Sequence, residues 1–236
     1  MIIWLASFPR SGNTFFRLLF HHLYQDYTYS VYNDPLLEEM GASEILGQKT
    51  LDCSIEECRQ SDKTYLLKTH DLPTDDSPVV YLVRDGRDAL VSYTHYQMKF
   101  THGKGAKARL KEFLGKNTFE SILRHTICKT TGSENWSNHV LTWLRDKPNP
   151  NTVMIRYEDL VAGPIETMQK AVGPFGFRAG DSTSLPTFDE LNRKWPNFFR
   201  KGKSGSWKTE MPEEHQTLFH QHHGEAMQFL GYRSNS

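Results

Sequence analysis

Long apolar runs, net charge and a cysteine framework are all missing from this chain of 236 residues. No stretch approaches the ~20 apolar residues of a transmembrane helix, and the short apolar opening lacks the basic residues of a secretion signal. The 28 basic and 28 acidic side chains cancel, which argues against bulk binding of nucleic acid or of a membrane surface. The three cysteines lack metal-ligand spacing and favour a reducing compartment, so we expect a cytoplasmic protein.

The remaining composition is that of a globular protein, with 37% hydrophobic and 24% charged residues. Short apolar segments typical of buried parallel strands are Ile2–Ala6, Tyr65–Lys68, Val79–Val83 and Thr152–Arg156. Helical patterns occur at Gly12–Tyr24, Asp85–Phe100, Glu134–Arg145 and Pro212–Leu230. This alternation predicts an α/β fold with a mainly parallel central sheet flanked by helices. No shift in composition divides the chain, so we predict one domain over residues 1–236.

The segment after the first strand has the layout of a phosphate loop: a tight turn, then a helix that starts near Gly12. Unpaired N–H groups and the helix dipole favour an anion at such a place. The loop nevertheless departs from the nucleotide-triphosphate motif, because Asn13 stands where that motif has lysine and only Thr14 matches beyond the glycine. An ordinary glycine turn is the alternative interpretation, which Arg10 weakens because its guanidinium can bind anionic oxygens.

Three further segments carry cations, and two of them lie at the ends of predicted strands. The third strand is followed by Arg84, and a helix then carries Ser92 two turns on. Lys68 and His70 lie at the end of the second strand, where active-site groups gather in parallel sheets. A basic glycine-bearing loop spans residues 200–208. Taken singly, each segment has a plain alternative: a solvated charge cluster, a structural histidine and a flexible basic loop.

In order and spacing, these four segments resemble the sulfotransferases that use 3′-phosphoadenosine 5′-phosphosulfate (PAPS). Ser7–Phe15 resembles the 5′-phosphosulfate loop of that family, and Arg84 and Ser92, eight residues apart, match its 3′-phosphate strand and helix. Residues 200–208 resemble its C-terminal Arg-Lys-Gly loop that ends in a Trp-Lys pair. Lys68-Thr69-His70 matches the segment with the catalytic histidine. The resemblance implies a single-domain, P-loop-like three-layer fold.

The resemblance also implies the reaction, which is in-line transfer of a sulfuryl group from PAPS to an acceptor hydroxyl or amine, leaving the bisphosphate PAP. His70 would be the general base, and Arg10 and Lys68 would offset charge on the phosphate and sulfuryl oxygens. No metal is expected, because cationic side chains neutralise the charge. The implied PAPS-binding residues are Arg10, Ser11, Gly12, Asn13, Thr14, Phe15, Arg84, Ser92, Tyr157, Phe188, Arg200, Lys201 and Gly202.

Departures from the family pattern leave several questions open. Arg10 replaces the lysine of cytosolic members, which favours an electrostatic role over proton donation. The segments that build acceptor pockets are short, so the acceptor stays a small molecule or a carbohydrate of unknown identity. The oligomeric state is equally open, because no dimerisation signature follows Lys208. Two other functions remain as alternatives. One is a P-loop nucleotide kinase or NTPase, which Asn13 disfavours, and the other is a non-catalytic PAPS- or PAP-binding module, which His70 disfavours.

Overall fold

Six parallel strands form one sheet in the order β3-β2-β4-β1-β5-β6. The structure is a computed structural model that describes residues 1–31, 41, 43–100, 118–130, 132–180, 185–194 and 202–233. The strands are β1 Ile2–Ala6, β2 Thr28–Ser30, β3 Gln48–Thr50, β4 Tyr65–Thr69, β5 Val79–Val83 and β6 Thr152–Arg156. The predicted parallel α/β fold is therefore confirmed, and all four predicted strands are present. Prediction missed β2 and β3, which are three residues long.

Helices cover both faces of this sheet. Those with bounds close to the prediction are α1 Asn13–Tyr24, α4 Gly86–Phe100 and α12 Glu213–Leu230. The others are α3 Ile55–Gln60, α6 Phe119–Ile127, α7 Trp136–Leu141, α8 Tyr157–Ala162, α9 Pro164–Val172, α10 Phe188–Lys194 and α11 Trp207–Glu210. A π-helical turn, Thr142–Asp146, continues α7, and a 3₁₀ turn, Gly173–Phe175, follows α9. The helix predicted at 134–145 thus changes its winding midway.

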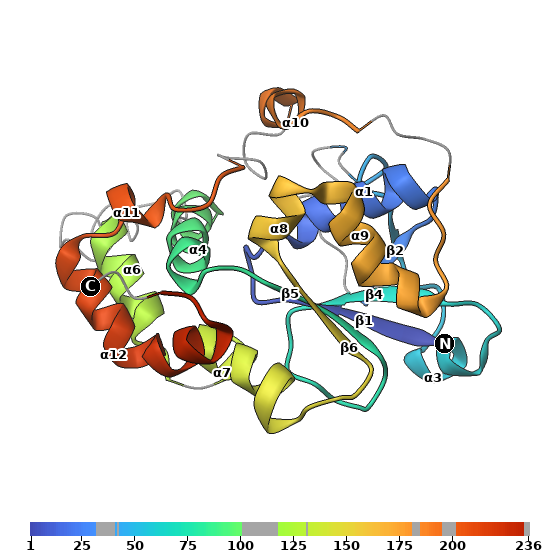
Figure 1. Ribbon diagram of the computed structural model, residues 1–236, viewed down its shortest axis with the longest axis horizontal. Helices are drawn as coiled ribbons and strands as arrows, with labels where there is room; N and C mark the ends of the chain where they lie inside the picture. Colours follow the sequence, from blue (N-terminus) through green and yellow to red (C-terminus); the bar gives the residue numbers. More distant parts are fainter. Residues whose placement is uncertain are drawn as a thin grey trace, which may run out of the picture.

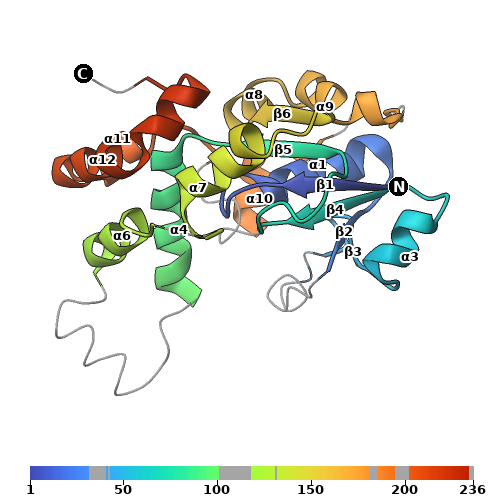
Figure 2. The same ribbon diagram turned by 90° about the horizontal axis from the view of Figure 1, so that it is seen from below.

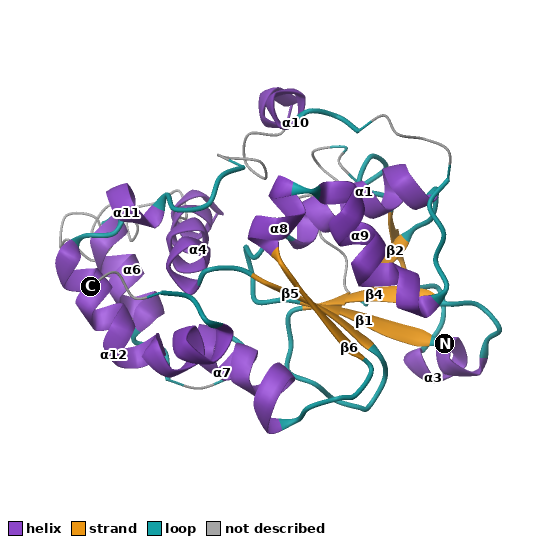
Figure 3. Ribbon diagram, in the orientation of Figure 1, coloured by secondary structure: helices purple, strands orange, loops and turns teal. Residues whose placement is uncertain are grey.

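Two hydrophobic cores lie against the two faces, because successive side chains of a strand point to opposite sides. Ile3 and Leu5 of β1 pack in the core shared with α1, α8 and α9. Trp4 and Ala6 pack in the core shared with α4, α6, α7 and α12. The strands therefore lie between two groups of helices, as Figures 1 and 3 show. This is the three-layer arrangement that the sequence predicts.

The carboxyl ends of the four central strands point to one edge of the sheet. β1 lies between β4 and β5, and the chain winds from it in both directions. Such a switch point is where open parallel sheets bind their ligands. Figure 2 shows β3 at one border of the sheet and β6, beneath α8 and α9, at the other. The segments that follow β1, β4, β5 and β6 begin with Ser7, His70, Arg84 and Tyr157.

Cys53 and Cys58 form a disulfide, contrary to the reduced cysteines that the sequence predicts from their odd number. Cys53 directly precedes Ser54, the N-cap of α3, and Cys58 lies within the helix. The Ser54 hydroxyl accepts a hydrogen bond from the Glu57 N–H, and the Glu57 carboxylate accepts one from the Ser54 N–H. This capping box starts α3, whose first turn brings the two cysteines close to each other. Cys128 is free.

None of the helices among the described residues is long and apolar enough to cross a membrane. Residues 101–117 are basic and contain glycines, a composition that predicts a surface loop leading into a helix, but they lie outside the described residues.

Candidate active site

The loop between β1 and α1 has the geometry of a phosphate cradle. Gly12 has φ of +105°, in the left-handed region where glycine is favoured. A Cβ placed there would lie 2.4 Å from Cδ2 of Tyr157, so the position also needs glycine for space. α1 begins at Asn13, and the first N–H groups of a helix have no partner within it. The N–H of Ser11, one of the implied PAPS-binding residues, is already engaged, because it donates to the Phe8 carbonyl at 3.2 Å.

Asn13, which replaces the motif lysine, points into the protein. Its Nδ2 atom donates to the Ser7 hydroxyl at 3.2 Å and lies 3.5 Å from the Leu5 carbonyl. The side chain is 5% exposed. Asn13 therefore ties α1 to the end of β1, and it leaves no cation at the place where a triphosphate would need one.

His70 is held with one ring nitrogen turned toward the loop. Nδ1 lies 2.7 Å from the main-chain oxygen of Ser7. Because a carbonyl oxygen can only accept, Nδ1 carries the proton and Nε2 has the free lone pair. Burial and the nearby Lys68 charge lower the pKa of His70 well below its ordinary value. The ring is therefore neutral near pH 7, and its Nε2 atom carries no proton.

A second buried histidine supports the first from behind. His139, fully buried, lies with Nε2 3.2 Å from the His70 carbonyl and with Nδ1 2.8 Å from the Tyr81 hydroxyl. One helical turn on, the Trp143 indole N–H donates to the Asp71 carbonyl at 3.0 Å. Two side chains thus hold two consecutive carbonyls after β4. Sequence reasoning missed both partners, although the two tryptophans around His139, Trp136 and Trp143, are a local signal for this segment.

The expected second anion site joins three distant segments. Arg84 donates to the Arg10 carbonyl and to the Lys203 carbonyl, both at 3.2 Å, and its guanidinium lies 4.4 Å from the centre of the Tyr157 ring. Nε of Arg10 donates to the Ser92 hydroxyl at 3.3 Å. The first loop, the start of α4 and the segment before α11 therefore meet at one place, as the order of the motifs predicts.

The structure describes some of the other residues that the resemblance implies for the site, but not all of them. Lys68 lies in β4 opposite Leu5 and is 7% exposed. Thr14 and Phe15 lie half-buried in the first turn of α1. Gly202 has φ of +58°. Arg200 and Lys201 lie outside the described residues, as does the side chain of Phe188, which begins α10.

Two buried polar atoms fit a bound anion. The Ser11 hydroxyl oxygen and Nε of Arg84 are buried without a hydrogen-bond partner within the described part of the chain. Both groups can donate a hydrogen bond, so both are available to anionic oxygens at this place. No group of three potential metal ligands occurs among the residues that the structure describes. The buried histidines of α12 contact main-chain oxygens: Nε2 of His215 lies 3.1 Å from the Glu120 carbonyl, and Nε2 of His223 lies 3.1 Å from the Ile127 carbonyl.

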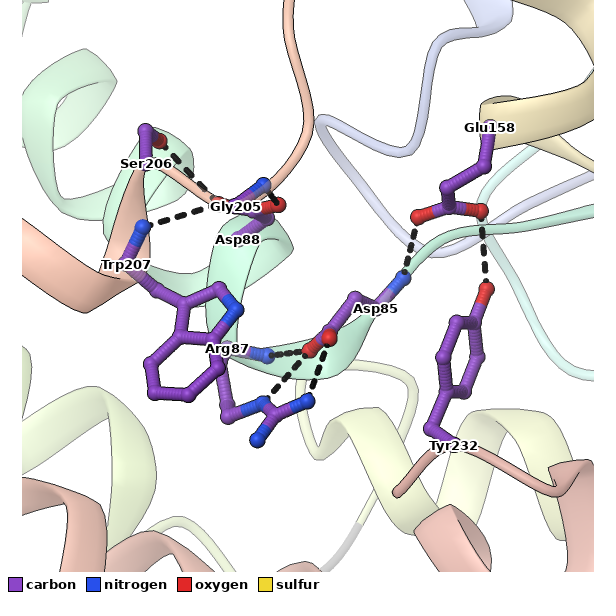
Figure 4. A network of polar contacts seen from close by, with 8 residues as sticks. All are labelled: Asp85, Arg87, Asp88, Glu158, Gly205, Ser206, Trp207 and Tyr232. Atoms are coloured by element: carbon purple, nitrogen blue, oxygen red, sulfur yellow. Dashed lines mark hydrogen bonds and ion pairs between the residues drawn. The ribbon is translucent and has the colours of Figure 1, made fainter. Parts of the chain in front are cut away.

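The charges around the start of α4 are buried, so they do not form the solvated cluster that was the plain alternative. Arg84, Asp85, Arg87 and Asp88 are each at most 8% exposed. Arg87 donates to both carboxylate oxygens of Asp85, at 3.0 and 2.7 Å. Figure 4 shows this pair between two other carboxylates, Asp88 and Glu158, each of which accepts hydrogen bonds from another part of the chain.

Comparison with known proteins shows the family of this chain. The model of the sulfotransferase domain family matches residues 2–231. Mouse sulfotransferase 1E1 is 23% identical over 94% of this chain and 82% of its own length. Cytosolic sulfotransferase 1 of Arabidopsis thaliana is 24% identical over 89% and 73% of the two chains. The crystal structure of retinol dehydratase with androsterone and the inactive cofactor PAP has a TM-score of 0.64 and 18% identity, over 99% of this chain and 82% of that one, which shows a common fold. The chain belongs to the sulfotransferase domain family, and it is a PAPS-dependent sulfotransferase.

Proposed function

We propose that this protein transfers the sulfuryl group of PAPS to a hydroxyl or amine of a small acceptor, with His70 as the general base. One observation carries this assignment. Nδ1 of His70 donates to the Ser7 carbonyl at 2.7 Å, so the basic Nε2 is free at the edge of the sheet where the phosphate loop begins. PAPS would supply the activated sulfuryl group, and the chain would bind, orient and exchange a proton.

The binding roles follow from the contacts around the loop. The N–H groups of Gly12, Asn13 and Thr14 begin α1 and would hold the 5′-phosphate, together with the unpaired Ser11 hydroxyl. Arg84 has a free Nε, and with Ser92 it would hold the 3′-phosphate. Phe15 and Phe188 are the proposed adenine contacts, and Tyr157 is a further proposed PAPS-binding residue. Arg200, Lys201 and Gly202 remain proposed ligands of the 3′-phosphate.

Proton transfer and charge stabilisation fall to different side chains. Neutral His70 would accept the acceptor's proton at Nε2 as the acceptor oxygen or nitrogen attacks sulfur. Arg10 and Lys68 would stabilise negative charge on the sulfuryl and phosphate oxygens. A guanidinium holds its proton at any working pH, so the role of Arg10 is electrostatic.

The alternative functions have less support. A nucleotide kinase or NTPase would need a cation where Asn13 points inward to Ser7. A non-catalytic PAP-binding module would not need the free Nε2 of His70. The androsterone bound in the retinol dehydratase structure supports a small-molecule acceptor, and a carbohydrate is the second candidate.

Similarity to a cytosolic sulfotransferase supports a cytoplasmic location. The single sheet with a core on each face supports one domain over residues 1–236.

Calorimetric titration with adenosine 3′,5′-bisphosphate (PAP) and with ATP tests the nucleotide. We expect the bisphosphate to bind more tightly, and tighter binding of ATP would overturn the assignment. Catalysis is tested with radiolabelled PAPS and a panel of hydroxyl and amine acceptors. We expect His70→Ala to abolish label transfer while PAP still binds. A mutant with the activity of the wild type would exclude His70 as the base.

A further inference from the structure

The first turn of α4 carries a buried carboxylate that holds a distant segment of the chain. Asp88 is 1% exposed. Its Oδ2 atom accepts from the Gly205 N–H at 2.6 Å, and Oδ1 accepts from the Ser206 hydroxyl and the Trp207 N–H, both at 3.0 Å. Figure 4 shows all three donors converging on this carboxylate. Burial of a carboxylate is costly unless donors satisfy it, so these bonds fix residues 205–207 on α4.

Two neighbours of Asp88 hold the same segment. The Arg87 guanidinium lies 3.7 Å from the centre of the Trp207 ring, and Asp85 keeps it in place through two hydrogen bonds. Arg84 donates to the Lys203 carbonyl at 3.2 Å. Residues 84–88 therefore contact the segment at both of its ends, and the anion-binding Arg84 is one of the contacting groups.

Helix geometry connects Asp88 with the nucleotide site. Ser92 is one turn further along α4, so the two side chains are neighbours on one side of the helix. Gly202 precedes Gly205 by three residues, so the chain between them can span no more than about 10 Å. Gly202 has φ of +58°, which suits a tight turn of the main chain. A single helix thus presents Ser92 and, by holding residues 205–207, limits where Gly202 can lie.

We propose that Asp88 is a positioning residue for the 3′-phosphate, and that it sets the preference of the enzyme for nucleotides that carry this phosphate. Asp88 repels anions and does not touch the nucleotide. Its effect comes from holding residues 202–207 beside Arg84 and Ser92. The inference rests on the proposed use of PAPS, because PAPS and its product PAP carry a 3′-phosphate that ordinary adenosine 5′-phosphates lack.

The test compares two ligands that differ only in this group, PAP and adenosine 5′-monophosphate, by calorimetry on the full chain. In Asp88→Asn the amide turns an N–H donor toward another donor and removes the charge. We expect PAP to bind at least about tenfold more weakly, with binding of the monophosphate changed less than about twofold. Ser206→Ala removes one of the three bonds and should weaken PAP alone by about threefold.

A matched control is Asp75→Asn, because Asp75 accepts from the Trp4 indole and the Ser77 N–H in the loop before β5. That substitution should leave the ratio of the two affinities unchanged. If folded Asp88→Asn keeps the wild-type ratio, the positioning role is overturned while the use of PAPS stands. If Asp88→Asn does not fold, Ser206→Ala decides: an unchanged ratio overturns the role, and a reduced one supports it. A wild type that does not prefer PAP overturns the proposed function and the inference together.

Discussion

His139 lies with its Nε2 atom 3.2 Å from the main-chain oxygen of His70. Since a carbonyl oxygen can only accept, His139 donates from Nε2 and accepts the Tyr81 hydroxyl proton at Nδ1, 2.8 Å away. Both histidines of the pair are therefore neutral, each in a tautomer chosen by a carbonyl. His139 holds the main chain of His70, the proposed base. Replacing His139 should therefore change catalysis, although His139 does not contact the substrate.

Replacement of His139 tests this support. His139→Phe would leave the His70 carbonyl and the Tyr81 hydroxyl unpaired, and we expect unfolding to become easier by about 1–3 kcal/mol per group. His139→Gln can keep a donor to the carbonyl and should lose less stability and less kcat. Urea unfolding and kcat of both variants are the measurements. Equal losses in the two variants would show that the hydrogen bond to His70 is not what matters.

Acid should destabilise the folded state through its buried histidines. Burial lowers the pKa of His139 to about 3 and that of His223 to about 4, against 6.5 in an unfolded chain. The unfolded state therefore binds more protons between these values, and stability falls as pH drops below 6.5. Each histidine should add a slope of about 1.4 kcal/mol per pH unit. Urea unfolding from pH 7 to pH 5 measures the slope, and His139→Gln and His223→Gln should each flatten it.

Two glycines should respond in opposite directions to alanine. Gly12→Ala places a methyl group 2.4 Å from the Tyr157 ring at a φ of +105°. We expect loss of PAP binding and destabilisation of about 2 kcal/mol or more. Gly224 lies in α12, where an added Cβ meets nothing within 4 Å, so Gly224→Ala should stabilise by about 0.5–1 kcal/mol. Thermal unfolding and PAP titration of both variants check this; Gly12→Ala with unchanged PAP binding would contradict the proposed cradle.

Arg10 should act through its charge. Its φ of +67° is one that asparagine tolerates, so Arg10→Asn removes the charge with little backbone cost. We expect kcat to fall by about 10²–10³-fold. Arg10→Lys keeps the charge and should retain more of the rate. A steady-state assay with PAPS decides, and equal losses in the two variants would indicate that the guanidinium geometry, and not the charge, is required.

The disulfide gives a chemical test of the structure near α3. A thiol reagent should detect one cysteine, Cys128, in the native oxidised protein and three after reduction in denaturant. Cross-linking of so short a loop should stabilise the fold by about 2 kcal/mol. Urea unfolding with and without reductant measures that difference. Detection of three thiols in untreated native protein would contradict the pairing of Cys53 with Cys58.

Local patterns predicted the elements whose signal lies within one segment. The four central strands are short and apolar, and Gly12 together with Arg10 indicated the phosphate loop between β1 and α1. The meeting of Arg10, Arg84 and Ser92 followed from strand order, because parallel strands end at one edge.

Prediction stopped at interactions between distant residues. His139 and His70 are 69 positions apart, and Asp88 and Gly205 are 117 apart, so no local periodicity connects them. β2 and β3 have three residues each and no alternation of their own. Sequence alone indicated a solvated charge at Asp88, because its three hydrogen-bond donors lie 117 to 119 positions further along the chain.

The hold of Asp88 on residues 205–207 also affects how the protein is made. A ribosome releases the strands, the loop and His70 long before Trp207 emerges. The last wall of the nucleotide site is therefore still unmade when all six strands have emerged. α12, whose Phe219, Met227 and Leu230 complete the core on one face of the sheet, emerges later still. Nucleotide binding should therefore stabilise only a chain that has been completed through these residues.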